Sequence, residues 1–498
     1  MFSFLLLIGG NNKILSEKVL NVYSGISQKL PIPTNSTVKE LPDELNLLLF
    51  QPVEKKITSL HHVFQFEDNF IYSFGTIFGE PDVNVSEYLF AIYDKKGEKA
   101  VQQVDGSFSF IIYNSNTKKL KMICDAVGDR RVHYFYNEDN IIISSLDILI
   151  FSTGLVSDRI NKLSVLEMLA FNSSRIGNSI IKDIENIKPY EILEFRSFNP
   201  TKKISCPFSD LDPILKNSEL KKKINDIIKT LRDKSKSYIM KANQIEFDLT
   251  AGKDSRSVFS LLKDLVDKKR SKVRTRGEEH CLDNLFARKV TKIYGFKHEN
   301  VKLMKIDNKE FKSNLYAFAL FCNGNTNGIR TIDEINYKDV DDLRFGGVRT
   351  TPESFKIPKI IRKENVIEEI SKFFLDQYFK FPMVSETEYC KINEYINQIV
   401  KDIYSINHNI EFTLKALVLY MLYSNSGILI NHRNWQLQNI EPFLSQDVAK
   451  LYFLTPLQKL KDFMLYPEIV NKFAPEIISY PINGNYFNRL SKKKNTLL

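Results

Sequence analysis

The chain has 498 residues, of which 43% are apolar and 26% charged, and its formal net charge is +10. This length suggests two to four domains, each able to bury its own core, and the composition is that of an ordinary soluble globular protein. Neither an internal repeat nor a low-complexity tract is evident. Because the lysines are scattered and no basic stripe is interleaved with aromatic residues, we expect no nucleic-acid partner.

The cysteines and the apolar segments indicate the compartment. Five cysteines lie far apart without a C-x-x-C pair, which is typical of reduced thiols and argues against zinc. The apolar start, Phe2–Ile8, has no basic segment and no cleavage site, so it predicts a first strand rather than a signal peptide. The most apolar helical stretch, Leu414–Tyr423, is too short to span a bilayer. We therefore expect a cytoplasmic protein without a membrane partner.

Short apolar runs separated by Asp, Asn and Gly turns fill the first 200 residues. The predicted strands are Asn69–Phe78, Ser107–Asn114, Leu120–Cys124, Val132–Tyr136 and Ile141–Ser145. Such hairpin-rich spacing predicts an antiparallel sandwich or layered sheet over residues 1–200.

The pattern changes after Pro200. A polar segment leads into a helical run, Ser218–Lys241, and then strands and helices alternate. The predicted elements are a strand ending at Leu249, the strand Lys272–Thr275, a helix over Leu282–Tyr294 and the strand Glu299–Leu303. This alternation predicts an α/β domain with a parallel sheet, whose ligands bind at the carboxyl ends of the strands. From Lys363 onward the pattern is helical.

The turn after Leu249 is the most informative segment. A strand, a turn of small residues (Thr250–Gly252) and an amphipathic helix opened by Asp254 and Ser255 follow one another. In this geometry backbone N–H groups and the helix dipole converge on an anion, and small residues let a phosphate approach closely. Asp254 is suited to hold a magnesium ion against that phosphate. From this segment alone, simple capping of the helix remains an equal alternative.

This turn resembles the Ser-Gly-Gly-x-Asp-Ser signature of the ATP pyrophosphatase (PP-loop) superfamily and differs from a Walker A loop. Thr250 and Ala251 stand in its first two places, whereas Gly252, Asp254 and Ser255 are kept. The methyl group of Ala251 would be strained if that position required a positive φ.

Further motifs along nearly the whole chain resemble those of one family, the class B asparagine synthetases. Its relatives include β-lactam synthetases, lasso-peptide macrolactam synthetases and amide-forming proteins of bacterial glycan clusters. The shared order of the motifs is the strong signal, since each is weak alone. The matching segments are Asp105–Phe110, Asp125–Tyr134, Ser144-Ser145, Ile184–Tyr190, Asp283–Gly295 and Glu441–Ser445.

The resemblance implies two domains. Residues 1–200 would form an Ntn-hydrolase-like antiparallel β domain (an αββα sandwich). Residues 201–498 would form an α/β PP-loop synthetase domain, adenine nucleotide α-hydrolase-like, with a helical C-terminal part. The family's glutaminase uses an N-terminal cysteine as nucleophile. Here residue 2 is Phe2 and no cysteine precedes Cys124, so we expect no glutaminase activity; Ser3 would serve only after unusual processing.

The resemblance also implies the roles of the synthetase residues. ATP would place its pyrophosphate on Thr250–Ser255 (Thr250, Ala251, Gly252, Asp254 and Ser255) and its adenine near Leu249 and Thr275, and Asp254 would ligate Mg²⁺. A substrate carboxylate would be adenylated, and an amine would displace AMP, with catalysis resting on positioning and charge stabilisation. Lys253 and Arg256 flank Asp254, and we assign Lys253 a catalytic role. Each of the two side chains either contacts phosphate or is a charge that faces solvent.

The second acid of the family's site is harder to place. Family members carry it in a Gly-x-Gly-x-Asp/Glu loop, and the nearest counterpart here is Arg344–Glu353. Gly347 would contact ATP, but no acid stands at the expected offset, so Glu353 is the candidate second metal ligand. Arg433, a candidate catalytic residue, and Trp435 would line the acceptor site, or only pack.

Three functions remain in competition. The first is an AMP-forming ligase that joins a small-molecule or peptide carboxylate to an amine donor, with a homodimer left open. The second is a catalytically degenerate homologue that acts as a binding or scaffold partner. The third is a PP-loop enzyme acting on tRNA. The sequence shows neither the zinc ribbon nor the basic RNA-binding extension that would favour this third function.

Overall fold

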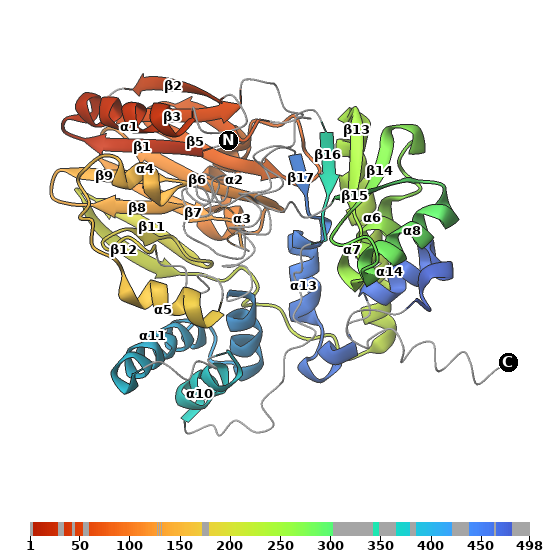
Figure 1. The fold of residues 1–498 in the computed structure, drawn as a ribbon. Coiled ribbons are helices and arrows are strands. Elements are labelled where there is room, and N and C mark those ends of the chain that lie inside the picture. Colours follow the sequence, from red (N-terminus) through yellow and green to blue (C-terminus); the bar gives the residue numbers. More distant parts are fainter. Residues whose placement is uncertain are drawn as a thin grey trace.

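The computed structural model of this chain describes residues 3–27, 34–41, 45–52, 59–126, 128, 130, 132–171, 179–301, 342–347, 365–378, 385–420, 438–462 and 465–480. An antiparallel two-sheet domain is followed by an α/β domain, with further helices beside both (Figure 1). Within these residues, no helix is long and apolar enough to cross a membrane.

The first domain contains two six-stranded sheets, in which all neighbouring strands are antiparallel. One has the order β10-β8-β9-β1-β3-β2, with β1 (Ser3–Gly9), β2 (Thr34–Leu41), β3 (Leu45–Pro52), β8 (His133–Tyr136), β9 (Asn140–Ser144) and β10 (Glu185–Asn186). The other has the order β12-β11-β7-β6-β5-β4, with β4 (His61–Phe66), β5 (Asn69–Ile77), β6 (Gly106–Asn114), β7 (Lys119–Cys124), β11 (Glu191–Arg196) and β12 (Asn199–Ile204). The strands predicted from the apolar runs are confirmed.

The two sheets form the middle layers of four. On β1, Phe4 and Leu6 point into the core between the sheets, whereas Leu5 and Leu7 face the helix α1. A strand buried on both faces is a continuous apolar run, as β1 is. The opposite sheet is covered by α2 in the same way. The helices of this domain are α1 (Asn12–Ser27), α2 (Val85–Lys96), α3 (Glu98–Gln102), α4 (Asp147–Phe151) and α5 (Lys162–Phe171). The layering is that of an αββα sandwich; the strand pattern of the sequence did not predict α1 and α2 individually.

The second domain contains a parallel sheet of order β15-β14-β13-β16-β17. Its strands are β13 (Gln244–Asp248), β14 (Ser271–Arg276), β15 (Lys297–Val301), β16 (Asp342–Phe345) and β17 (Gln438–Ile440). Its helices are α6 (Asn217–Lys241), α7 (Lys253–Leu262), α8 (Leu282–Tyr294), α10 (Val366–Tyr378), α11 (Glu386–Tyr404), α13 (Gln446–Leu454) and α14 (Leu465–Phe473), with 3-10 turns η1 (Lys268–Arg270), η4 (Pro442–Leu444), η5 (Leu457–Asp462) and η6 (Pro475–Ile477). The predicted α/β alternation is confirmed, but the late region is not wholly helical because β17 joins the sheet.

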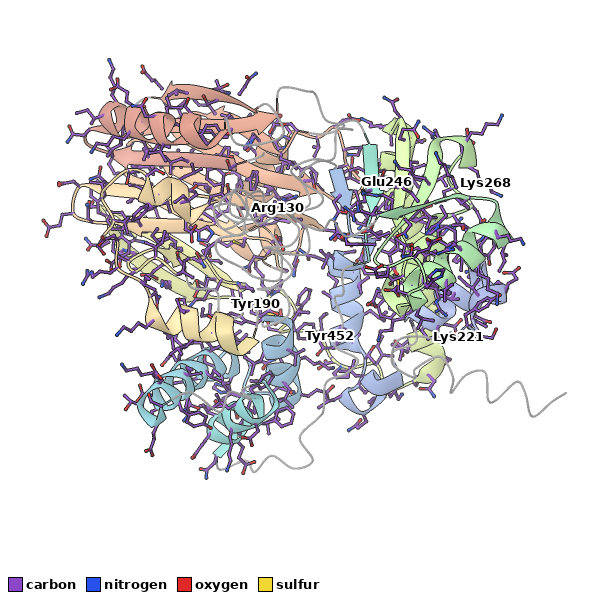
Figure 2. All side chains as sticks on the ribbon, in the orientation of Figure 1. Arg130, Tyr190, Lys221, Glu246, Lys268 and Tyr452 are labelled. Atoms are coloured by element: carbon purple, nitrogen blue, oxygen red, sulfur yellow. The ribbon has the colours of Figure 1, made fainter. Side chains whose placement is uncertain are left out.

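The two faces of β13 differ in chemistry. Phe247 packs its ring against Phe259 of α7 and Phe345 of β16, with centroids 5.5 and 5.7 Å apart. On the other face Glu246 is fully buried and forms ion pairs with Lys272 (2.7 Å) and Arg274 (3.1 Å) (Figure 2). Both faces of β13 are therefore in contact with neighbouring elements just before the turn that follows the strand.

Asp105 connects the two domains. Its carboxylate accepts hydrogen bonds from Ser445 Oγ (2.9 Å) and Gln446 N (2.7 Å) at the start of α13, and it forms an ion pair with Lys234 of α6. Burial raises the pKa of the Asp105 carboxyl, although Lys234 opposes this. Gln446 Nε2 in turn donates to the carbonyl of Gln102 at 2.6 Å. The first domain thus caps a helix of the second.

We expect Asp105→Ala to lower the free energy of unfolding by about 2 kcal/mol, because it removes a helix cap and one partner of a partly buried ion pair. Lys234 keeps Asp447 as a second partner, which limits the loss. Urea denaturation measures the change. Asp210→Ala, which breaks an exposed ion pair with Lys99, is the control and should leave the midpoint unchanged; equal effects of the two variants would contradict the capping role.

The buried carboxyl group of Asp147 should make the stability of the first domain depend on pH. Burial raises the pKa of its carboxyl to about 6, and Ser179 Oγ donates to it at 2.7 Å. Between about pH 4 and 6 the folded state therefore holds a proton that the unfolded state has lost. Stability from this group should fall as the pH rises through that window, by up to about 3 kcal/mol. Asp147→Asn should remove this part of the slope in urea titrations at pH 4 to 7; an unchanged slope would contradict the assignment.

Candidate nucleotide site

The turn between β13 and α7 lies where the order of the sheet reverses. β14 and β15 lie on one side of β13, and β16 and β17 lie on the other. At such a switch point the connections leave toward opposite faces and open a crevice at the carboxyl ends of the strands. The segment Thr250–Gly252 follows the carboxyl end of β13, and Gly346-Gly347 follows the carboxyl end of β16. The structure therefore brings the predicted turn and Gly347 together.

The amides of the turn are satisfied by side chains. Thr250 N donates to Ser255 Oγ at 3.0 Å, and Gly252 N donates to Thr250 Oγ1 at 3.1 Å. Ala251 N donates to Asp283 Oδ1 of α8 at 2.8 Å. Ala251 does not have a positive φ, so the strain considered for its methyl group does not arise. Asp283 was not predicted as a site residue; only its position in a family-like motif pointed to it.

Two glycines at the end of β16 lie in close contact with neighbouring elements. A Cβ on Gly347 would lie 2.5 Å from Ser255 N, a backbone atom at the start of α7, so any other residue would force the backbone to shift. A Cβ on Gly346 would lie 2.0 Å from Glu441 Oε1, which is the end of a side chain. Gly347 is therefore required by the backbone packing, whereas Gly346 is required only for the present position of the Glu441 carboxylate. The glycines of the family-like loop therefore have a local physical reason here.

Glu441 is the acid that the structure brings to this edge of the sheet. It directly follows β17, the neighbour of β16, and its side chain is mostly buried. Asn439 Nδ2 donates to Glu441 Oε1 at 2.7 Å. The sequence motif predicted the second acid a few residues after Gly347. Glu441 instead comes from the next strand of the sheet and was not predicted as a site residue. A signal did exist, because an acid directly after a strand of a parallel sheet lies at its ligand-binding edge.

Lys253 and Asp254 begin α7 and are both buried. Lys253 Nζ lies 5.8 Å from the centre of the Tyr466 ring on α14, so the lysine is not a solvent-facing charge. Asp254 lies beside Ser255, within the segment that Gly347 contacts. Both positions are compatible with the predicted roles, which stay predictions.

Arg256 has a different role from either interpretation of the sequence. Its side chain is fully buried and donates to the carbonyls of Ala251 (3.1 Å), Ile477 (3.2 Å) and Tyr480 (3.0 Å). Its guanidinium also lies 4.2 Å from the centre of the Phe286 ring. Burial lowers its pKa to about 10, which leaves it protonated at neutral pH. Arg256 thus braces the back of the turn and faces neither phosphate nor solvent.

The remaining predicted residues fall in three places. Leu249 is fully buried in the core, and its carbonyl accepts a hydrogen bond from Thr275 Oγ1 at 2.8 Å. Both lie at the carboxyl edge, where the adenine contact stays a prediction. Glu353 and Arg433 lie outside the described residues, as does Trp435. Among the residues that are described, no group of three or more His, Cys, Asp or Glu side chains is arranged to hold a metal ion. Mg²⁺ bound with nucleotide needs only one or two protein carboxylates, so Asp254 still fits it.

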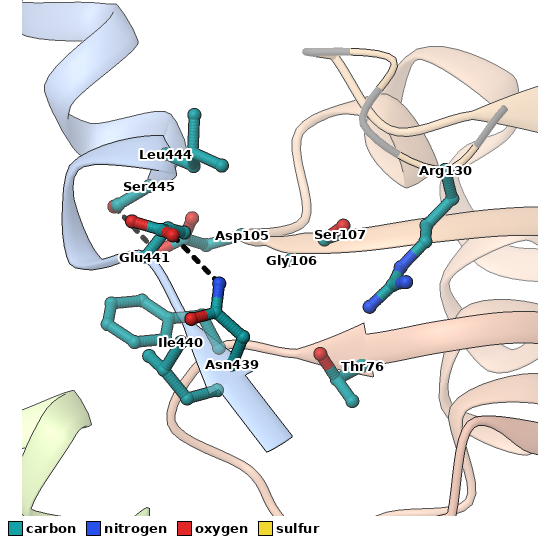
Figure 3. Close-up of a pocket in the computed structure, with 11 residues that line it drawn as sticks. Thr76, Asp105, Gly106, Ser107, Arg130, Asn439, Ile440, Glu441, Leu444 and Ser445 are labelled. Atoms are coloured by element: carbon teal, nitrogen blue, oxygen red, sulfur yellow. Dashed lines mark hydrogen bonds between the residues drawn. The ribbon is translucent and has the colours of Figure 1, made fainter. Parts of the chain in front are cut away.

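A pocket lies between the two domains beside this edge (Figure 3). Its volume is about 50 Å³, which is room for a few molecules of the size of water. Arg130 reaches toward it from the side opposite Glu441. Its other polar lining residues are Thr76, Asp105, Ser107, Asn439 and Ser445.

In the first domain, burial keeps two potentially reactive side chains, Cys124 and His61, in their uncharged forms. Burial raises the pKa of the Cys124 thiol well above its usual range, which keeps the thiol protonated. Burial also lowers the pKa of His61 to about 3, so its ring is neutral, and Nδ1 lies 2.8 Å from the Tyr72 hydroxyl. Asp125 accepts from the amides of Gly128 (2.8 Å) and Phe108 (3.1 Å). The family-like hairpin is thus stabilised by its own acid.

Residues 81–204 match the model of a glutamine amidotransferase domain. This match covers a quarter of the chain and supports an amidotransferase-like first domain, as the motifs predict. It does not reach the parallel sheet. The chain matches no curated protein.

Similar solved structures are distant. The glutamine phosphoribosylpyrophosphate amidotransferase from B. subtilis, complexed with ADP and GMP, shares 8% identity over 71% of this chain and 83% of its own, with a TM-score of 0.27. The structure of the allosteric regulatory enzyme of purine biosynthesis shares 8% identity over 75% of this chain and 78% of its own, with a TM-score of 0.27. The glutamine-dependent NAD⁺ synthetase from Acinetobacter baumannii, in complex with ADP, shares 13% identity over 52% of this chain and 60% of its own, with a TM-score of 0.19. At these TM-scores the superpositions support no detailed argument.

We expect Arg256→Lys to lower the free energy of unfolding by about 2–4 kcal/mol, because a lysine cannot reproduce the planar fork that serves three carbonyls. Thermal unfolding measures the loss. Arg288→Lys on α8, where the arginine is exposed, is the matched control and should unfold like the wild type. An Arg256→Lys variant with unchanged thermal stability would show that the hydrogen bonds from Arg256 to the three carbonyls do not stabilise the fold.

Proposed function

We propose that this chain is an ATP-dependent, AMP-forming ligase of the asparagine synthetase type that makes an amide without hydrolysing glutamine. The observation that carries the proposal is the strand–turn–helix unit of β13, Thr250–Gly252 and α7 at the switch point of a parallel sheet. It follows an amidotransferase-like domain, as in the family that the motifs resemble. Strand, small-residue turn and helix start together form a site for a polyphosphate.

The proposed chemistry has two steps. A carboxylate oxygen of the substrate attacks the α-phosphorus of ATP, the bond to the β-phosphate oxygen breaks, and pyrophosphate leaves. The nitrogen of an amine then attacks the acyl carbon, the bond to the AMP oxygen breaks, and the amine gives up a proton. Mg²⁺ held by Asp254 would neutralise the phosphates. Glu441, at the same sheet edge, is the residue we assign to accept the proton.

A second candidate is a catalytically degenerate homologue that binds a partner. The observation that favours it is the turn itself, whose amides are already satisfied by Ser255, Thr250 and Asp283. Titration with Mg-ATP separates the two candidates. Micromolar binding supports the ligase, and no binding under any condition supports the scaffold.

We expect Asp254→Ala to reduce ATP–pyrophosphate exchange by at least about 100-fold, because it removes charge stabilisation at the phosphates. Exchange is measured with a panel of carboxylates, including aspartate, to find the one that the wild type activates. Asp264→Ala, an exposed acid just after the end of α7, is the matched control and should keep full exchange. Exchange that survives Asp254→Ala would refute the assignment of the site.

A further inference from the structure

A carboxylate from another element occupies the middle of the phosphate turn. Asp283 lies in the first turn of α8, 32 residues after Ala251, and accepts the hydrogen bond from Ala251 N. The neighbouring amides of Thr250 and Gly252 are satisfied by hydroxyl groups within the turn. Of these three acceptors, Asp283 alone carries a charge. The turn therefore already binds an anion, and that anion belongs to the protein.

Asp283 is placed so that it can leave. Ala251 is fully buried, whereas Asp283 is only half-buried, so the carboxylate is the more accessible partner of this hydrogen bond. Rotation of its side chain would move it away from Ala251 while it stays at the N-terminus of α8, where the helix dipole favours a negative charge. Its position after leaving is therefore also a stabilised one.

We propose that Asp283 is a built-in competitor for phosphate, which closes the turn at Ala251 until a polyphosphate displaces it. Carboxylate and phosphate oxygens use the same backbone donor, and their negative charges repel at contact distance. Binding is thus an exchange of one anion for another, and the exchange lowers the affinity of the turn. This inference rests on the proposed ATP site.

Removing the charge of Asp283 tests the proposal by the direction of the change in affinity. Asp283→Asn keeps the size and an acceptor oxygen of the side chain but removes its charge. We expect Mg-free ATP and inorganic pyrophosphate to bind this variant about tenfold more tightly than the wild type, which corresponds to about 1.4 kcal/mol. Isothermal titration at constant ionic strength measures the two dissociation constants.

Glu278→Gln is the matched control. It removes an equal charge from an exposed position five residues earlier, so it reports the long-range effect of net charge alone. We expect its affinity to stay within about twofold of the wild type, since exposed charges are screened beyond about one Debye length. Equal tightening in both variants would overturn a role for the contact with Ala251.

The outcomes separate this inference from the proposed function. If the wild type binds ATP and Asp283→Asn binds it equally or more weakly, Asp283 is a structural or receiving group and the competitor role is overturned, while the ATP site stands. If only the variant binds, the competitor role is supported in its strongest form. If neither binds, both proposals are overturned. Should Asp283→Asn fail to fold, Asp283→Ser, which suits a first helical turn, gives the same comparison.

Discussion

The carboxylate of Asp105 at the start of α13 is the charged contact that joins the first domain to the end of the parallel sheet. α13 begins at Gln446, only six residues after β17 ends at Ile440, so a contact that holds α13 also holds the carboxyl end of β17. Glu441 lies in that short connection, against Gly346. The first domain thereby positions an acid at the ligand-binding edge of the second, without contributing a strand to its sheet.

This contact gives the first domain a role that is independent of its own chemistry. Its three apolar layers, one between the sheets and one under each outer helix, make it a rigid body. From that body, Asp105 and the carbonyl of Gln102 reach α13. A sandwich in which burial keeps Cys124 protonated and His61 neutral still contacts α13 of the second domain.

Backbone hydrogen bonding explains the shape of the proposed phosphate site. Buried amides and carbonyls require partners, and a tight turn between a strand and a helix leaves several without a place in either element. In this chain the amides are satisfied from the front by Ser255 and Asp283, and the carbonyl of Ala251 is satisfied from behind by Arg256. The turn is held on both sides, and the exchange with phosphate that we propose concerns only the amide of Ala251. We therefore expect the stability of the turn to depend on Arg256 and its affinity for phosphate to depend on Asp283.

The order and type of most elements could be predicted from the sequence, because apolar alternation and turn residues act locally. The strands from Asn69 to Ser144 and the β–α alternation after Ser218 follow from such patterns. The turn Thr250–Gly252 was recognisable for the same reason, since small residues between a strand and a helix have a local chemistry. The helices α1 and α2 were not predicted individually, because their apolar faces are defined by the sheets that they cover.

The partners within the site were decided only by the tertiary structure. Arg256 is adjacent to the turn in sequence but turns inward, because two carbonyls more than 200 residues later await it. Asp283 reaches the turn from a neighbouring helix, and Glu441 reaches Gly346 at the same edge from a neighbouring strand. The sequence by itself determined that a strand, a small-residue turn and a helix follow one another after Gln244. Which charges meet at that turn was decided by the packing of parallel strands side by side, because that packing brings distant segments to one edge.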